Sequence, residues 1–124
     1  GIPDAWRAAM FGGTGATTNS TSCATCDPDG DGMNNRAEFL AGTNPTNAAS
    51  VLKLTALNPA GSGNVASLPS VSGIVYRVEL RDDLATSPWA LFMDQLVGTG
   101  GPLTINDTNA AALPRRFYRA GVLW

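Results

Sequence analysis

The sequence predicts a mainly β protein in which a β-sandwich follows a small helical module. Two short helix-like segments lie within residues 1–50, and short β-rich runs separated by turn residues follow from residue 51. The first fifty residues carry two basic and five acidic groups, a net charge of −3. Three of those acids lie within five residues, although like charges at that spacing repel one another. The acidic cluster therefore needs a chemical explanation.

Two helices are expected in the first module, over residues 2–11 and 34–41. In the first, Pro3 suits an opening turn and Asp4 favours the positive end of the helix dipole. Gly12 follows the first helix and Gly42 follows the second, and glycine commonly ends a helix. Small polar residues join the two helices, which predicts a long loop between them.

The remainder of the chain predicts a β-sandwich of the immunoglobulin or fibronectin kind. Short runs rich in β-branched and aromatic residues recur there between clusters of Gly, Pro, Asn and Ser, a pattern typical of sandwiches. These runs are residues 51–57, 65–68, 74–80, 91–97, 103–105 and 117–122. A tight turn at residues 81–83 would join two of them. The predicted domains are therefore 1–50 and 51–124.

The acidic cluster belongs to a twelve-residue pattern, D-x-[DN]-x-[DN]-G-x5-E, that residues 27–38 match at each specified position. This pattern wraps the chain around Ca2+, which prefers six to eight oxygen ligands. The predicted ligands are the side chains of Asp27, Asp29, Asp31, Asn35 and Glu38 and the carbonyl oxygen of Met33. A solvated acidic turn is the alternative, because the same residues favour turns.

The stretch DPDGDGMNNRAEFLAGTNP resembles the bacterial thrombospondin type 3 repeat, and its loop is similar to those of dockerins and EF-hands. The resemblance implies Ca2+ binding through the loop side chains named above. The opening GIPDAW resembles the back half of a second such repeat. Its front acids are missing, and Arg7 stands at the position that corresponds to Glu38, which argues against a second ion there.

The segments YRVELRDDLATSPWALF and LTINDTNAAALPRRFYRA resemble the β-domain that ends many large secreted proteins of Verrucomicrobia and Planctomycetes. This second resemblance implies a non-catalytic accessory region, secreted or on the cell surface of a bacterium. It implies no particular ligand.

Cys23 and Cys26 form a CxxC pair for which a local disulfide is expected. A thioredoxin-like site would follow a strand and open a helix, and zinc would need two further good ligands. Three aromatic residues, Trp89, Trp124 and Tyr76, form a possible platform for sugar rings, with packing as the alternative.

Composition narrows the function further. The chain has no His, which removes the His-dependent catalytic and zinc sites, and its net charge of −2 does not suit a nucleic-acid surface. No apolar run reaches the length that crosses a bilayer. We therefore expect a non-catalytic, Ca2+-stabilised extracellular module for surface attachment or self-assembly, with copies of itself or a parent polypeptide as partner. The alternative is a carbohydrate-binding module of a secreted polysaccharide-degrading enzyme.

Overall fold

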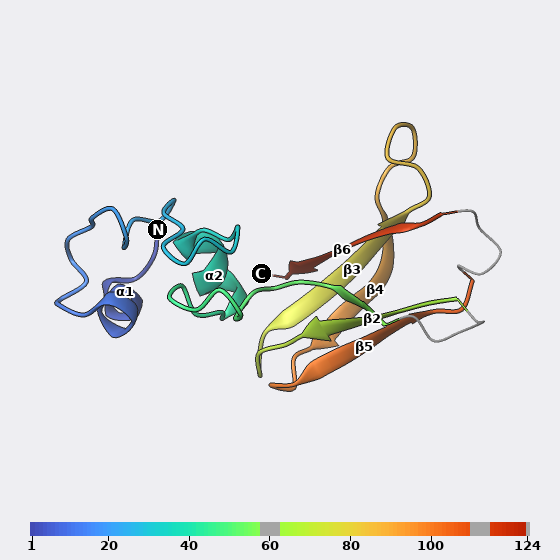
Figure 1. The fold of residues 1–124 in the computed structure, drawn as a ribbon. Coiled ribbons are helices and arrows are strands. Elements are labelled where there is room, and N and C mark those ends of the chain that lie inside the picture. The colour runs from blue at the N-terminus through green and yellow to red at the C-terminus, as the bar shows by residue number, and fades with distance from the viewer. Residues whose placement is uncertain (58–62, 110–114, 124) are drawn as a thin grey trace. The chain divides into compact units, whose positions relative to one another are not determined.

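A computed structural model describes residues 1–57, 63–109 and 115–123 (Figure 1). The chain divides into two compact units, Gly1–Val51 and Leu52–Trp124, where the sequence predicts domains 1–50 and 51–124. The described chain is mainly β, with two antiparallel sheets and two short helices, as the sequence predicts. Neither helix is long and apolar enough to span a lipid bilayer.

The first unit contains helices α1 (Asp4–Phe11) and α2 (Asn35–Ala41). Helix α1 begins two residues later than expected, because Pro3 is extended and serves as the N-cap. In α2 the Asn34 side chain accepts a hydrogen bond from the backbone N–H of Ala37, which caps the helix, and Gly42 ends it in the left-handed conformation.

The second unit is a sandwich of two three-stranded sheets. One sheet has the order β1-β2-β5 and the other β4-β3-β6, and all neighbours are antiparallel. The strands are β1 (Thr55–Leu57), β2 (Asn64–Pro69), β3 (Val75–Arg81), β4 (Ala90–Val97), β5 (Pro102–Asp107) and β6 (Phe117–Val122). Each overlaps one of the runs that the sequence predicts, and its ends differ from those of the run by at most two residues, except that β1 begins four residues into its run.

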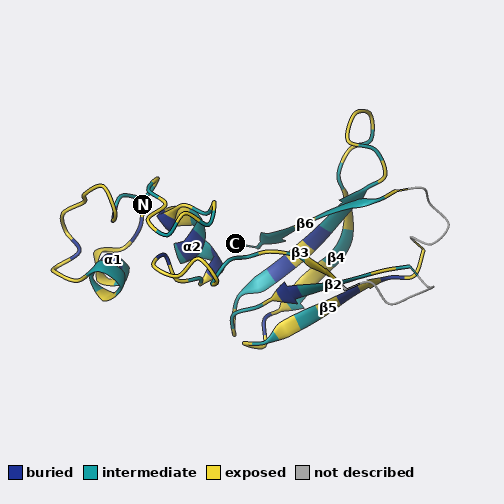
Figure 2. Cartoon of the chain, in the orientation of Figure 1, coloured by how far each residue is buried: buried dark blue, intermediate teal, exposed yellow. Residues whose placement is uncertain are grey.

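The sandwich core is formed by residues of both sheets, and buried positions lie on strands of each (Figure 2). Leu68 of β2 and Ile105 of β5 pack with Tyr76 and Val78 of β3, and all four are at most 2% exposed. The hydroxyl of Tyr76 accepts a hydrogen bond from the backbone N–H of Val71 at 2.9 Å. Tyr76 is thus a core residue with a satisfied polar end, which agrees with the packing alternative and removes it from a surface platform.

Two connections differ from the prediction. Strand β1 covers only the last three residues of the run 51–57, although Leu52 and Leu54 still pack against the core. Strands β3 and β4 are joined by residues 82–89 and not by a tight turn. This longer loop is held by Arg81, whose guanidinium donates to the carbonyl oxygens of Leu84 and Ser87.

Candidate metal centre

The loop at residues 27–38 is shaped by its own carboxylates. Asp27 accepts hydrogen bonds from the backbone N–H groups of Gly30 and Gly32, at 2.8 and 3.0 Å. The Oδ1 atoms of Asp29 and Asp31 accept from the N–H groups two residues further along. These bonds wind the backbone so that one carboxylate oxygen from each of the three acids lies within 4.8 Å of the others. The chain thus concentrates three negative charges in a small volume.

Four buried oxygens around this loop have no hydrogen-bond partner among the described residues. They are Oδ2 of Asp29, Oδ2 of Asp31, Oδ1 of Asn35 and Oε2 of Glu38. A buried acceptor without a partner costs about 1–3 kcal/mol, and more when it is charged. All four belong to residues of the predicted loop 27–38 and form an oxygen-only donor set that suits a hard cation.

Glu38 shows the electrostatic cost of this arrangement most clearly. Its side chain is fully buried on α2, and Oε1 accepts one long hydrogen bond, 3.4 Å, from the hydroxyl of Thr43. Burial, followed by the nearby charges of Asp29 and Asp31, raises the pKa of Glu38 to about 7. A bound cation would compensate both the burial and the repulsion, so the residues present fit a metal ion.

The comparison with known proteins agrees with this geometry. Residues 27–48 match the family model of the bacterial TSP3 repeat. The match covers the acidic loop, α2 and the turn that follows. No curated protein and no solved structure matches the chain. The resemblance of residues 27–48 is therefore supported. The resemblances of the opening GIPDAW segment and of the β-sandwich stay predictions.

The predicted ligands fall into two groups. Asp27, Asp29 and Asp31 lie together, and the unpartnered oxygens of Asn35 and Glu38 come from the first two turns of α2. Met33 lies between the groups and its N–H donates to Asp31 at 2.7 Å. The role of its carbonyl oxygen as a ligand stays a prediction.

Arg7 is a buried charged residue whose burial the sequence pattern does not reveal. It is only 7% exposed, and its guanidinium donates to the backbone carbonyls of Ser22 and Gly15, at 3.0 and 2.8 Å, and to Asp4. Gly15 permits this contact because a Cβ there would overlap the carbonyl of Asp4, and its φ of 76° favours glycine. The sequence does carry one signal: in the alignment of the two repeat-like segments, Arg7 stands at the position that Glu38 holds in α2.

Of the three residues of the predicted platform, the structure describes Trp89 and Tyr76. Trp89 lies in the loop before β4, where the guanidinium carbons of Arg81 and Arg119 lie 4.8 and 4.5 Å from its ring centroid. These contacts are cation–π interactions within the chain. Tyr76 is buried in the core, and Trp124 lies outside the described residues. Cys23 and Cys26, in contrast, form the expected disulfide.

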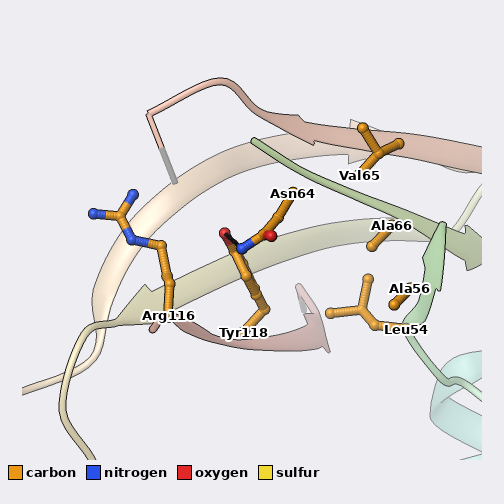
Figure 3. Close-up of a pocket in the computed structure, with 7 residues that line it drawn as sticks. All are labelled: Leu54, Ala56, Asn64, Val65, Ala66, Arg116 and Tyr118. Carbon is orange, nitrogen blue, oxygen red and sulfur yellow. Dashed lines mark hydrogen bonds between the residues drawn. The ribbon is translucent and has the colours of Figure 1, made fainter. Parts of the chain in front are cut away.

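A pocket of about 310 Å³ lies between β1, β2 and β6 (Figure 3). Its walls are mostly apolar, and its polar residues are Asn64, Arg116 and Tyr118. These polar groups are engaged within the chain: Asn64 donates to the hydroxyl of Tyr118, which donates to Asp107 at 2.7 Å. Arg116 donates to the same carboxylate at 2.8 Å. This network stabilises the sandwich.

Asp107→Asn is expected to destabilise the sandwich by about 2 kcal/mol, because two charge-assisted bonds end on this buried carboxylate. Burial raises the pKa of Asp107, but the bonds from Arg116 and Tyr118 lower it further, to below its ordinary value. The wild-type advantage should therefore be complete above the pKa of the unfolded carboxyl group and disappear as pH falls through the folded one. Urea denaturation across this pH range measures it.

Asp82→Asn is the matched control, because Asp82 binds the same arginine but its side chain is 47% exposed. It should produce a much smaller loss. Equal losses in the two variants would contradict the role given to burial at Asp107.

Proposed function

We propose that this chain is a non-catalytic extracellular module whose first unit is stabilised by one bound Ca2+. The observation that carries the proposal is the set of four unpartnered buried oxygens around an acidic loop that matches the TSP3 repeat. Calcium is favoured over other cations because the donors are carboxylate and amide oxygens alone. Softer metals would be expected to use thiolate or imidazole ligands, and residues 27–38 contain neither Cys nor His.

The extracellular location is supported by the disulfide of Cys23 and Cys26, since such bonds persist in oxidising compartments. A site with the affinity usual for extracellular modules, a Kd of about 10⁻⁴–10⁻³ M, would be at least half occupied at about 1 mM Ca2+. The absence of His and the internal pairing of the pocket groups favour a structural role over catalysis.

The structural role that we propose is surface attachment or self-assembly, as the tail of a larger secreted protein or as a filament subunit. Within the described residues, each outer strand of the two sheets pairs on one side only. Open strand edges are a common route to association between chains. Leu91 and Val97 of β4, at 57% and 60% exposed, add apolar surface next to such an edge. Carbohydrate binding is less favoured, because Tyr76 is buried and Trp89 is covered by arginines.

Calorimetric titration of chelator-treated protein with Ca2+ tests the metal site. We expect one ion per chain with a Kd of about 10⁻⁴–10⁻³ M, the range of extracellular modules. Mg2+ should bind more weakly, because it requires a smaller octahedral cage and dehydrates reluctantly. A flat titration with Ca2+ would refute the proposal.

Light scattering coupled to size exclusion, in Ca2+ and in chelator, tests association. Self-assembly predicts a mass that rises with protein concentration. A single-chain mass at all concentrations would leave attachment to a different partner as the role.

A further inference from the structure

Residues 19–26, here called the stapled segment, form a compact turn beside the metal centre. The side chain of Asn19 accepts hydrogen bonds from the N–H groups of Thr21 and Ser22, at 2.9 and 3.0 Å. The disulfide joins Cys23 to Cys26, and the N–H of Cys26 also donates to the carbonyl of Cys23 at 3.1 Å. The carbonyl oxygens of this segment thus have fixed positions.

One side of the stapled segment holds Asn35. The Nδ2 of Asn35 donates to the carbonyls of Thr21 and Cys23, at 2.7 and 2.6 Å, and its backbone N–H donates to the carbonyl of Cys26 at 2.8 Å. The side chain is 0% exposed. Because two bonds to Nδ2 fix the plane of the amide, they also fix the direction of Oδ1, the buried oxygen that has no partner.

The other side of the segment is held by Arg7. Its Nε donates to the carbonyl of Ser22, the residue between the two whose carbonyls hold Asn35. A guanidinium holds its N–H donors in a rigid planar fork. A second donor of the same group, Nη1, binds the carbonyl oxygen of Gly15. Helix α1 is therefore connected to Asn35 through three consecutive residues of the stapled segment.

We infer that Arg7 and the Cys23–Cys26 disulfide are positioning groups of the ion site, which act by fixing the Oδ1 of Asn35. This inference rests on the proposed function. Neither group contacts the ion in this scheme. Loss of either one loosens the carbonyls that orient Asn35, so a ligand that is now fixed in advance would have to be ordered when Ca2+ binds.

Reduction of the disulfide by a dithiol should therefore weaken Ca2+ binding, by a factor on the order of ten. In that reaction the dithiol attacks one sulfur, and two electrons and two protons pass to the protein. The products are two cysteine thiols and the cyclic disulfide of the reductant. Linkage requires the reciprocal effect: Ca2+ must shift the equilibrium of this reduction toward the disulfide by the same factor.

The test uses the full chain in a buffer that contains dithiothreitol in both redox forms. Calorimetry measures the Kd for Ca2+ of the oxidised and of the reduced protein. Thiol counting measures the reduction equilibrium in chelator and in saturating Ca2+. We expect the Kd for Ca2+ to change on reduction by the same factor by which Ca2+ changes the reduction equilibrium. In Asn35→Ala, we expect reduction by the dithiol to leave the Kd unchanged. Equal Kd values for the oxidised and reduced wild type would overturn the inference alone, as would a dithiol effect that persists in Asn35→Ala. No Ca2+ binding by the oxidised wild type would overturn the proposed function as well.

Arg7→Gln separates a positioning role from a simple effect of charge, because the two predict opposite changes in the Kd for Ca2+. Removing a positive charge should by itself favour binding of a cation, whereas losing the fork should raise the Kd about tenfold. Arg36→Gln is the matched control, since Arg36 is exposed on α2 and its backbone bond to Ala24 is unaffected. It should leave the Kd unchanged or lower it. A lower Kd in both variants would overturn the role given to Arg7.

Discussion

Glu38→Gln is expected to destabilise the protein when Ca2+ is present and to stabilise it when Ca2+ is absent. In saturating Ca2+ the variant should be the less stable protein, because glutamine has no charge and one carbonyl oxygen where the site needs a closing carboxylate. We expect a loss of affinity of about a hundredfold, or about 2.7 kcal/mol. In chelator the variant should be the more stable one, since wild type then buries a carboxylate beside Asp29 and Asp31.

Thermal melts of both proteins, in Ca2+ and in chelator, measure the four stabilities that this comparison needs. Asp94→Asn serves as the control, because Asp94 is an exposed acid on β4, outside the metal unit. Its effect should be the same in both conditions. If Glu38→Gln and wild type kept the same order of stability with and without Ca2+, Glu38 would not be a ligand.

Chelation of wild type is expected to loosen residues 27–48 and to leave the sandwich folded. Without the ion the acids of the loop repel one another, and the seven residues of α2 are too few to hold a helix alone. A ligand that binds only the folded loop adds RT ln(1 + [Ca2+]/Kd), about 2.7 kcal/mol at a hundredfold excess over Kd. The core of Leu68, Tyr76, Val78 and Ile105 belongs entirely to the second unit.

Hydrogen exchange followed by mass spectrometry resolves the two units. Peptides that cover 27–48 should exchange faster in chelator, while those that cover β2 and β3 should keep their protection. Unchanged exchange of the loop would show that it is an ordinary acidic turn. Loss of protection in β3 would show that the two units unfold together.

The sequence was sufficient for most of the features that depend on local chemistry. Glycine follows each helix as expected, and the spacing of the loop acids likewise acts within a few residues. The N-cap role of Asn34 was not predicted, because the expected helix 34–41 includes this residue. The strands were also predictable, because their apolar residues alternate or cluster between turn residues.

Features that depend on distant contacts were not predictable. Arg7 is buried because the carbonyls of Gly15 and Ser22 surround it, and helical periodicity alone treats an arginine as exposed. The sequence alone does not show whether the hydroxyl of Tyr76 has a partner in the interior. In the fold the backbone N–H of Val71 donates to it, which lets the whole side chain be buried. The loop at 82–89 is longer than a tight turn because Arg81 organises it from the end of β3.

The buried guanidinium of Arg7 has a consequence for how the first unit responds to a changing environment. Its positive charge is covalently attached, so it cannot diffuse away, whereas the charge that Asp29 and Glu38 require is exchangeable. At low Ca2+ concentration, only the part that the ion orders, residues 27–48, should become accessible to proteases. The part held by Arg7 should keep its structure, so reordering requires only that one short loop closes. Loop closure takes on the order of 100 ns for a flexible chain. Reordering of residues 27–48 should therefore follow the arrival of the ion without a slower step of its own.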